Sequence, residues 1–521
     1  MVLLEQFERL RIEAYGAMGA DRGSLGQYYT PQPIASLLAS MLPKPSVDTV
    51  HLLDPGAGVG MLSAAAVAEL RATGVREIQL TCCEVDSAVV PYLRVGMKML
   101  VDWCKARGVI LQVEIIEADF ILWAMDHLGE SDFFSAPPRR FDGVVMNPPY
   151  KKIGSSSLHR RCLKRAGLEC TNLYAAFLFL GAKLLRPGGQ LVSINPRSFA
   201  NGPYFRDFRK KFFALAPLHA VHVFNRRDLA FANDKVLQEN VVLHAVRGVQ
   251  SETIRIISSV AGGPAARVHD VPAHRAIEPD DADCVLHLET DAGDSEVANL
   301  IRALPARLAD LGLEVSTGRV VDFRVREALS FLKKRDAVPL IYPQHLRNAG
   351  VVWPKQAKKP DYFCPGDQHA AALIPAGTYV VTKRFTSKEE KRRIAASLLT
   401  IESVPAEQYA LENHLNYFHA VGAPMDDDLA RGLVAYLNST LADQYFRLYN
   451  GHTQVNATDL RAMPYPPATA LRKLGRKLAG LPLTTEHVDP FITQLCRANA
   501  EGQGKGSSVH SGRTRRSSRA A

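Results

Sequence analysis

One glycine-rich turn constrains the fold of this chain more than any other feature. An apolar run over residues 51–54 leads into Pro-Gly-Ala-Gly-Val-Gly, and an alanine-rich segment with helical character follows over 62–70. Glycines at Gly56, Gly58 and Gly60 allow a tight turn and a close approach of the backbone to a ligand. Their spacing differs from that of the dinucleotide-binding fingerprint. A strand, a glycine turn and a helix in this order predict one unit of an alternating α/β fold.

Three further apolar runs along the chain also end in polar or aromatic residues. These runs and the residues at their ends are 78–83 with Glu84, 111–117 with Asp119 and Phe120, and 142–146 with Asn147. In an open α/β sheet the carboxyl ends of parallel strands lie along one edge, where ligands bind. Each residue taken singly is an ordinary loop or capping residue. Four strand ends of this kind in succession predict that these side chains share one binding site.

The side chains at these strand ends suit a ligand built on a nucleoside. The Glu84 carboxylate can accept hydrogen bonds from both hydroxyls of a ribose. Asp119 can accept from the amino group of an adenine, and Phe120 follows it in the sequence and can pack beside the ring. We therefore predict a nucleoside-containing cofactor at the carboxyl edge of the sheet.

The fourth strand end carries the sequence Asn147-Pro-Pro-Tyr150. Because proline fixes φ and lacks a backbone donor, Pro148 and Pro149 make a stiff corner whose carbonyl groups are available as acceptors. The Asn147 side chain adds another carbonyl acceptor, and Tyr150 adds a flat ring for stacking. Two acceptors can grip the hydrogens of an exocyclic amino group and direct its nitrogen toward an electrophile. The simpler interpretation is an ordinary strand-to-loop turn that ends in a surface tyrosine.

The composition is that of a globular chain with an excess of positive charge. Of its 521 residues, 47% are hydrophobic and 22% are charged, and the formal net charge is +10. No apolar run approaches the roughly 20 residues that a membrane helix needs, and the charged N-terminus does not suit a signal peptide, so we expect a cytoplasmic protein. The eight cysteines form no Cys-x-x-Cys pair, which argues against a zinc site. The net charge is compatible with a polyanionic partner.

Changes in composition divide the chain into five segments. We predict a lead-in helix over 1–25, a catalytic domain over 26–260, an irregular connecting segment over 261–295, an α+β domain over 296–498 and a disordered basic tail over 499–521. Basic and aromatic residues interleave in the fourth segment, and such side chains neutralise phosphates and contact bases. For each single cluster, a solvated basic face is the alternative.

Three shorter segments carry expectations of their own. Residues 151–170 are polar and basic, which predicts a mobile loop over the site. Residues 428–449 have the apolar spacing of one amphipathic helix. Residues 386–395 are compatible with a plain charged helix.

These motifs and their order resemble the adenine-N6 DNA methyltransferases of restriction–modification systems, in the gamma-ordered group that includes the TaqI and PstI modification enzymes. The resemblance covers residues 25–245 in detail and 296–465 in general layout. The segments that carry it are Gln27-Tyr-Tyr-Thr-Pro31, Asp54-Pro-Gly-Ala-Gly58, Glu84-Val-Asp86, Ala118-Asp-Phe-Ile-Leu-Trp123, Asn147-Pro-Pro-Tyr150, Asn172-Leu-Tyr-Ala-Ala-Phe177 and Leu185-Arg-Pro-Gly-Gly189. The resemblance implies a Rossmann-like methyltransferase fold, followed by a C-terminal domain that recognises the DNA target.

By this resemblance the cofactor is S-adenosylmethionine. The residues implied to bind it are Tyr29, Thr30, Asp54, Gly56, Gly58, Glu84, Asp86, Asp119 and Phe120. The residues implied in catalysis are Asn147 and Pro148, which would grip the target amino group, and Tyr150 and Phe231, which would contact a flipped base. The implied partner is double-stranded DNA, with a separate restriction endonuclease as companion and with no metal.

Two other functions fit part of the pattern. The Asn-Pro-Pro-Tyr corner also suits the amide of a protein glutamine or an RNA base, but such an enzyme would not need a long additional segment rich in basic and aromatic residues. A non-catalytic DNA-binding module would not need a complete set of cofactor and catalytic residues. Within DNA methylation, asparagine rather than serine before Pro-Pro-Tyr favours adenine over cytosine N4, and a Pro-Cys nucleophile for cytosine C5 chemistry is absent.

Overall fold

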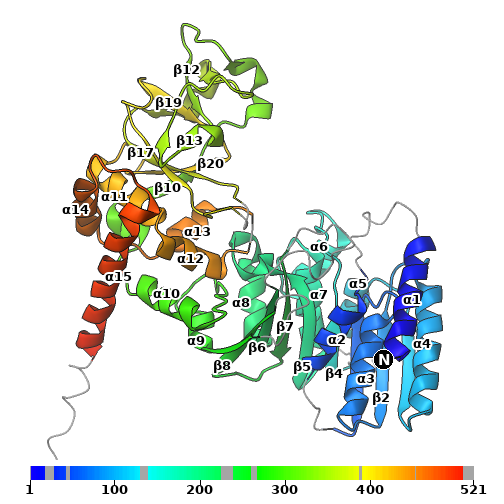
Figure 1. Cartoon of the computed structure of the whole chain (residues 1–521). Coiled ribbons are helices and arrows are strands. Elements are labelled where there is room, and N and C mark those ends of the chain that lie inside the picture. The colour runs from blue at the N-terminus through cyan, green and yellow to red at the C-terminus, as the bar shows by residue number, and fades with distance from the viewer. Residues whose placement is uncertain are drawn as a thin grey trace, which may run out of the picture. The chain divides into compact units, whose positions relative to one another are not determined.

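The computed structural model describes residues 2–17, 29–42, 47–128, 139–224, 239–259, 267–386, 390–451 and 453–507. The chain forms two compact units, Met1–Asp291 and Ala292–Ala521 (Figure 1). Each unit has its own sheets and helices. Among the described helices, none combines the length and the hydropathy needed to cross a membrane.

A nine-stranded sheet with the order β3-β2-β1-β4-β5-β7-β6-β8-β9 forms the centre of the first unit. Its strands are β1 (Thr49–Pro55), β2 (Glu77–Cys83), β3 (Ile110–Ile116), β4 (Phe141–Met146), β5 (Leu185–Pro196), β6 (Leu218–Phe224), β7 (Asn240–Val246), β8 (Thr253–Ser259) and β9 (Arg267–Pro272). The first five strands in this order run parallel, whereas β7 is antiparallel to both β5 and β6. The order reverses between β1 and β4, and such a reversal is the point where open α/β sheets bind ligands.

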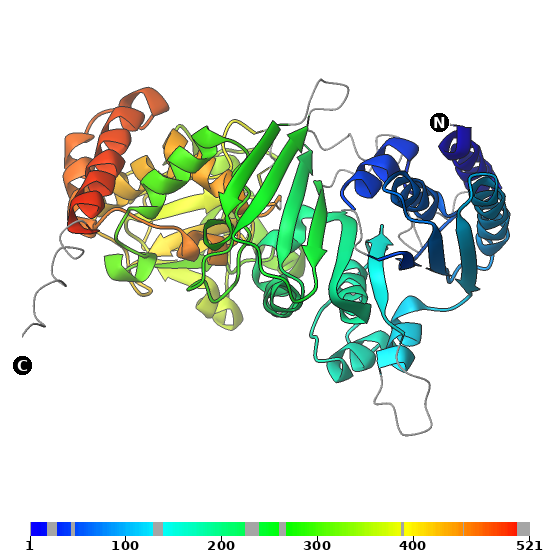
Figure 2. The same ribbon diagram turned by 90° about the horizontal axis from the view of Figure 1, so that it is seen from below.

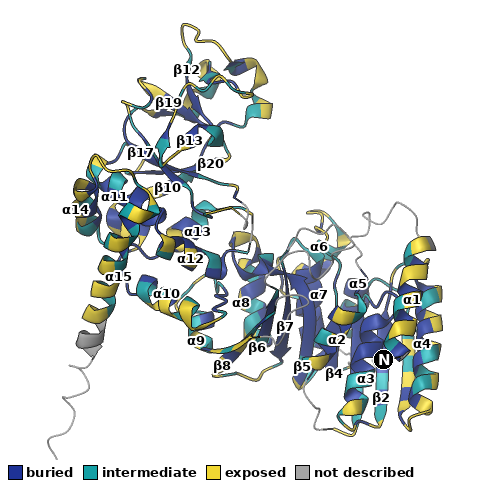
Figure 3. Cartoon of the chain, viewed as in Figure 1, coloured by how far each residue is buried: buried dark blue, intermediate teal, exposed yellow. Residues whose placement is uncertain are grey.

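Helices cover both faces of this sheet (Figure 2). The helices on one face are α1 (Val2–Ala17), α2 (Gln32–Ser40), α3 (Met61–Ala72) and α4 (Val90–Lys105). Those on the other face are α5 (Phe120–Leu128), α6 (Leu158–Arg165), α7 (Leu173–Leu184) and α8 (Arg206–Leu215). Central strands are therefore buried on both sides, and every residue of β7 is buried (Figure 3). The predicted α/β class, with a Rossmann-like methyltransferase arrangement, is confirmed.

The α7 helix shows how sequence and packing are matched in this unit. Ten of its 12 residues are buried, because the helix packs against α5, α8 and β5. A helix with apolar side chains on all sides is stable only in such surroundings. Gly181 permits a close approach to the sheet, since a Cβ at this position would lie 2.7 Å from the end of the Met146 side chain on β4.

The first unit extends past the boundary that composition suggested. We expected the catalytic domain to end at residue 260 and an irregular segment to cover 261–295. Strand β9 lies within that segment and pairs antiparallel with β8, and the short helix α9 (Ala273–Ala276) follows it. The unit ends at Asp291. The strand was missed because β9 lies at the edge of the sheet and exposes half of its residues, so its sequence lacks an apolar run.

The second unit is an α+β structure with two further sheets. Their strand orders are β10-β20-β17-β18-β14-β13 and β11-β15-β12-β19-β16. The strands are β10 (Glu314–Thr317), β11 (Leu329–Ser330), β12 (Val338–Ile341), β13 (Leu346–Arg347), β14 (Gly350–Val351), β15 (Tyr362–Phe363), β16 (Leu373–Pro375), β17 (Tyr379–Lys383), β18 (Ala396–Leu399), β19 (Gln408–Leu411) and β20 (Leu415–His419). The helices are α10 (Ala292–Arg302), α11 (Asp427–Leu437), α12 (Thr440–Tyr449), α13 (Ala457–Ala462), α14 (Ala468–Lys477) and α15 (Thr485–Ser507).

Two helices replace the single helix predicted over 428–449. Between α11 and α12, the Asn438 side chain bonds to both backbone groups of Ala396, and the Ser439 hydroxyl accepts from a backbone N–H of α12 as its N-cap. Residues 390–395 form no helix, so the predicted charged helix is absent from this part of the described chain. Helix α15 continues past the boundary predicted at residue 498, and the predicted tail from residue 508 onward lies outside the described residues.

Two glycines allow α11 and α14 to pack closely. A Cβ at Gly432 would lie 2.0 Å from the Leu471 carbonyl oxygen, and a Cβ at Gly475 would lie 1.9 Å from the Asp428 carbonyl oxygen. Both obstacles are backbone atoms, which cannot rotate away as a flexible side chain can. The two helices therefore approach each other backbone to backbone at two points.

We predict that Gly432→Ala lowers the free energy of unfolding by about 1–3 kcal/mol or more, the usual cost of overpacking. Thermal unfolding followed by circular dichroism measures the change. Gly502→Ala is the matched control, because Gly502 also lies in a helix of this unit and its added Cβ meets no atom within 4 Å. The control should keep or raise the melting temperature. Equal melting temperatures for the two variants would contradict the packing argument.

Candidate active site

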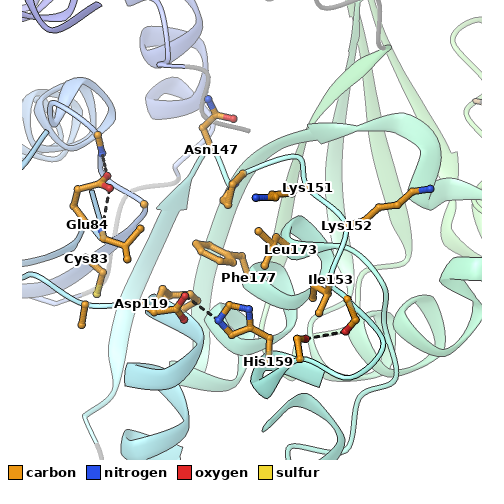
Figure 4. A pocket seen from close by; sticks show the side chains of 18 of the residues that line it. Cys83, Glu84, Asp119, Asn147, Lys151, Lys152, Ile153, His159, Leu173 and Phe177 are labelled. Carbon is orange, nitrogen blue, oxygen red and sulfur yellow. Dashed lines mark hydrogen bonds and ion pairs between the residues drawn. The ribbon is translucent and has the colours of Figure 1, made fainter. Parts of the chain in front are cut away.

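A cavity of about 300 Å³ lies at the carboxyl ends of β1, β2, β3 and β4, beside the reversal of strand order (Figure 4). The residues predicted from the sequence that line it are Tyr29, Gly56, Gly58, Glu84, Asp119, Phe120 and Asn147. The four strand ends that the sequence singled out therefore meet at one site.

The glycine turn forms one side of the cavity and is held by backbone hydrogen bonds. The Gly56 and Ala57 N–H groups donate to the Cys83 carbonyl at 2.8 and 3.0 Å, which joins the turn to the end of β2. Gly58 has a φ of +56°, and a Cβ there would lie 2.9 Å from the Tyr29 ring. Glycine is needed at this position both for the backbone conformation and for space.

Glu84 connects the glycine turn to the end of β2. Its carboxylate accepts hydrogen bonds from the N–H group of Gly58 at 2.8 Å and from those of Val85 and Asp86 at 2.9 Å. Burial raises the pKa of Glu84, and the backbone donors oppose that rise. A carboxylate offers about four lone-pair sites, so Glu84 keeps acceptor capacity for a ligand hydroxyl.

Asp54 lies behind the cavity rather than on its surface. We expected it to contact the cofactor, but its side chain is buried and accepts a hydrogen bond from the Ser63 hydroxyl at 2.6 Å. Burial raises the pKa of Asp54 to about 7, and the nearby Glu84 carboxylate adds to this rise. Because Ser63 belongs to the first turn of α3, Asp54 fixes the turn against the helix instead of presenting a group to a ligand.

Two other residues that we predicted to bind the cofactor make hydrogen bonds within the protein. The Thr30 hydroxyl accepts a hydrogen bond from the Asn147 amide at 3.2 Å. The Asp86 side chain accepts from the Ala88 N–H at 2.9 Å, in the turn that leads to α4. Neither Thr30 nor Asp86 is among the described residues that line the cavity. Phe231, which we predicted to contact the target base, lies outside the described residues.

Asp119 and Phe120 stand after β3, as predicted. One Asp119 carboxylate oxygen accepts from two backbone N–H groups at the start of α5, at 2.9 and 3.1 Å. The other oxygen lies 2.9 Å from His159 Nε2, and both side chains face the cavity (Figure 4). The Phe120 ring packs against Phe177 with the ring centroids 4.8 Å apart. An acidic acceptor and an apolar wall thus adjoin each other.

The segment after the Asn147–Tyr150 corner forms another wall of the cavity. We expected residues 151–170 to be a mobile loop, but they contain α6 and are joined to the start of α7. The Ile153 N–H donates to the Thr171 carbonyl at 2.8 Å, and the Leu173 N–H donates to the Lys151 carbonyl at 2.9 Å. The residues of this segment that line the cavity are Lys151, Lys152, Ile153, Gly154, Ser157 and His159.

We predicted no individual role for any of these six residues. Their position in the cavity wall could not be predicted from the basic composition of the segment, because a solvent-exposed loop has the same composition. One signal was available: Ser157 precedes the helical run and its hydroxyl accepts from the Arg160 N–H, which is the pattern of an N-cap. Phe177, which we quoted only as part of a motif, is the main apolar contact of Phe120 in the cavity.

Two neighbours hold the Asn147 side chain in one orientation. Its Nδ2 donates to the Thr30 hydroxyl, and its Oδ1 accepts from the Tyr150 hydroxyl, both at 3.2 Å. Asn147 and Pro149 line the cavity, whereas Pro148 is buried. The corner therefore places the Asn147 side chain at the margin of the cavity.

The cavity can bind a ligand that has hydrogen-bond donors at two points and a flat ring. Glu84 and Asp119 supply carboxylate acceptors, and Phe120 and Phe177 supply the apolar surface. In the described part of the chain, no group of three or more His, Cys, Asp or Glu side chains is placed to hold a metal ion.

Comparison with known proteins assigns the chain to a family. Residues 116–230 match the family model of the Eco57I restriction-modification methylase. The type II methyltransferase M.PstI of Providencia stuartii is 40% identical over 480 residues, which cover 91% of this chain and 93% of that protein. The type II methyltransferase M.BsuBI of Bacillus subtilis is 39% identical over 479 residues, which cover 91% and 94%. The chain belongs to the type II methyltransferase family.

The relationship to the PstI modification enzyme that the motifs indicated is thereby confirmed. Among solved structures, that of the type IIL restriction-modification enzyme MmeI in complex with DNA has a TM-score of 0.52 at 10% identity, and the match covers 95% of this chain and 73% of that one. At this level of identity the likeness concerns the fold alone. This type II methyltransferase thus combines a methyltransferase sheet with a cavity at its carboxyl edge.

We predict that Asp54 makes the stability of this type II methyltransferase depend on pH. The pKa of Asp54 is about 7 in the folded protein, against about 3.9 in an unfolded chain. Between these values the folded state binds a proton that the unfolded state has lost, so the contribution is full below about pH 4 and disappears as the pH rises through about 7.

Urea unfolding of the wild type and of Asp54→Asn at about pH 5 and about pH 8 measures this effect. The variant has no titratable group at this position, so the free energy of unfolding of the wild type relative to the variant should fall between the two pH values. A difference that stays constant would contradict an ionisable carboxyl group in this buried position.

Proposed function

We propose that this protein transfers a methyl group from S-adenosylmethionine to N6 of adenine in double-stranded DNA, as the modification enzyme of a restriction–modification system. The observation that carries the proposal is the Asn147 side chain at the margin of the cavity, where its amide is hydrogen-bonded to Thr30 and Tyr150. Transfer of a methyl group is the reaction expected of a member of the type II methyltransferase family. The acceptor oxygen at this position favours a target group that carries N–H hydrogens.

The residues of the cavity fit S-adenosylmethionine. Because Gly58 has no Cβ, the Tyr29 ring packs directly against the turn, and both line the cavity. Glu84 would accept from the ribose hydroxyls, Asp119 would accept from the adenine amino group, and Phe120 would pack against the adenine ring. The volume of about 300 Å³ is at the lower end of the range for small-molecule sites. The bound cofactor supplies a methyl group on a positively charged sulfur, which makes the methyl carbon an electrophile.

The residues of the corner would raise the reactivity of the acceptor nitrogen. The lone pair of a purine amino group is delocalised into the ring, so the nitrogen is a weak nucleophile. The Asn147 amide oxygen and the Pro148 carbonyl would accept its two hydrogens and stabilise the positive charge that develops on nitrogen. Thr30 keeps the amide in the required orientation by accepting from Nδ2. A rotated amide would present a donor to the target amino group.

This chemistry depends mainly on positioning, and the corner is supported from several sides. The Tyr150 hydroxyl lies 3.2 Å from Asn147 Oδ1 and 3.4 Å from the Ile194 carbonyl oxygen on β5, and its single proton is shared between these two acceptors. The Tyr150 ring packs edge-on against Tyr174, with the ring centroids 6.2 Å apart. In the proposed reaction this supported ring stacks on the target adenine.

An adenine inside a duplex must leave the base stack before its amino group can enter such a site. Unpairing costs a few kcal/mol, and stacking of the base on an aromatic side chain contributes about 1–3 kcal/mol. Stacking on Tyr150 would therefore offset a large part of the cost of flipping. We propose Phe231 as a second aromatic contact.

Three observations support DNA as the substrate. The chain has a net charge of +10, the family model that it matches is named for a restriction-modification methylase, and MmeI, which shares the fold, forms a complex with DNA. The second unit would recognise the target sequence. We further propose that a separate restriction endonuclease accompanies this enzyme and that both act in the cytoplasm, where bacterial DNA lies.

We predict that Asn147→Ala lowers the rate of methyl transfer by at least about 100-fold, the usual effect of losing one positioned group that stabilises charge. The affinity for S-adenosylhomocysteine should stay the same, because the amide contacts the target. Transfer of labelled methyl groups to DNA and isothermal titration calorimetry measure the two quantities. Asn147→Asp keeps an acceptor oxygen and should retain more activity than Asn147→Ala. A wild-type rate in the alanine variant would refute the role of Asn147.

The methylated atom has a separate test. DNA that the purified protein has modified is digested to nucleosides, and chromatography with mass spectrometry separates N6-methyladenine from N4-methylcytosine. We expect N6-methyladenine alone. Either N4-methylcytosine or methylation of protein without methylation of DNA would overturn the assignment of the substrate.

His159 provides a prediction for the cofactor site. His159→Ala should weaken the binding of S-adenosylhomocysteine by about tenfold, because a hydrogen bond to a charged group contributes roughly 1.5–3 kcal/mol and this one orients Asp119. Lys164→Ala is the control, since Lys164 is exposed on the same helix. In an Asp119→Asn background, the histidine substitution should have little further effect. Calorimetry that finds equal affinities for the His159 and Lys164 variants would contradict the role of His159.

A further inference from the structure

The second unit contains a groove that gathers positive charge. Four cationic side chains, Arg347, Lys383, Lys391 and Arg392, line a cavity of about 570 Å³. Among the described residues that line it, none is an aspartate or a glutamate, and none is aromatic. Amide and hydroxyl side chains supply the remaining polar surface. We call this surface, defined by the four cations, the basic groove.

Among the residues that the structure describes, only one cation of the basic groove has an ion-pair partner. In the described part of the chain, Arg347, Lys391 and Arg392 make no ion pair, and Lys383 lies 3.9 Å from Glu390. Arg347 and Lys391 are exposed, and Arg392 is half-buried. A concave site lined by charges of one sign concentrates the electrostatic potential and attracts the opposite charge. The charge of the groove therefore favours an anionic ligand.

The backbone around the basic groove is held in place without a ligand. Asn348 and Ala349 form the turn between β13 and β14 with φ of +49° and +63°, and the Ala349 carbonyl accepts from the Leu398 N–H at 2.8 Å. The Asn438 side chain bonds to both backbone groups of Ala396 at 2.8 and 3.0 Å. These bonds fix two sides of the groove, so binding would need little rearrangement of the main chain.

We propose that the basic groove binds the sugar–phosphate backbone of DNA and does so without reading base sequence. The proposal rests on the proposed function, because it names where the substrate is held. Lysine, arginine, amide and hydroxyl side chains are the usual partners of phosphate oxygens. The lack of aromatic side chains among the described lining residues disfavours unstacked bases as the ligand, because sites for such bases supply rings for stacking.

Contacts with phosphates have a measurable signature. The logarithm of the association constant falls linearly with the logarithm of salt concentration, with a slope of about 0.9 for each phosphate neutralised on duplex DNA. Replacing three cations that contact phosphates should therefore reduce the slope by about 2–3. Because phosphates carry no sequence information, the loss of affinity should be the same for duplexes with and without the target site.

The test compares the wild type with the triple variant Arg347→Gln, Lys391→Gln and Arg392→Gln. Fluorescence anisotropy over a series of salt concentrations measures binding to a duplex with the target site and to one without it. We expect weaker binding to both duplexes by one common factor, together with a shallower salt slope. At low salt the triple variant should raise KM for DNA and leave kcat unchanged. An unchanged slope, or a loss confined to the target duplex, would overturn the proposal.

The matched control removes the same charge from another surface of the same unit. Arg472, Lys473 and Arg476 lie together on α14, and the two arginines already pair with Asp426 and Asp428. Changing these three residues to glutamine should leave the affinity and the slope nearly unaltered. If the control variant loses as much as the groove variant, the effect is one of overall charge and the proposal fails. Circular dichroism shows whether each variant is folded.

The outcomes also separate this proposal from the proposed function. If the wild type does not methylate DNA, the proposed function fails, whatever the groove does. If the wild type methylates DNA and the groove variant binds it with the wild-type salt slope, only the basic groove is refuted.

Discussion

The hydrogen bonds that the Glu84 carboxylate accepts from the backbone are the interactions on which the rest of the site depends. One oxygen accepts from Gly58 in the turn after β1, and the other accepts from Val85 and Asp86 after β2. A buried carboxylate without such donors would cost several kcal/mol, and a turn whose N–H groups lacked acceptors would be costly as well. The acid and the glycine turn therefore stabilise each other, and together they form one side of the cavity.

A second constraint acts on the Asn147 amide, which has a donor at one end and an acceptor at the other. Only the acceptor is useful toward an amino group, so the orientation of the amide decides whether the corner can work. In the structure the Thr30 hydroxyl accepts from the amide nitrogen and the Tyr150 hydroxyl donates to the amide oxygen, at opposite ends of the side chain. Thr30 comes from the segment before α2, which explains why a Tyr-Thr-Pro sequence far upstream accompanies the corner. Its contribution to the site is made through the orientation of Asn147.

The sequence was sufficient for features that follow from strand direction, because the ends of parallel strands share one edge whatever the helices do. It was insufficient where a tertiary contact decides. The motif does not show which side of the turn Asp54 faces, and the buried Ser63 hydroxyl settles that question. His159 reaches Asp119 through the fold of a segment whose composition suggests a solvated loop. The break between α11 and α12 is stabilised by a hydrogen bond between Asn438 and Ala396, which is far away in the sequence. The apolar periodicity of residues 428–449 contains no information about this contact, so it predicts one continuous helix.

The Asn147–Tyr150 corner and one wall of the cavity belong to the same stretch of chain. Asn147 begins a segment that passes through Lys151 and Ile153 to His159, and all four residues line the cavity. The alignment of a methyl donor with an acceptor is sensitive to displacements of about 1 Å. This segment carries both the corner and one wall of the cavity. The hydrogen bonds that join the segment to the start of α7 therefore help to fix the position of the corner relative to the cavity, within the first unit. In the proposed reaction the second unit would recognise and hold the DNA, whereas the position of the corner relative to the cavity is set within the first unit.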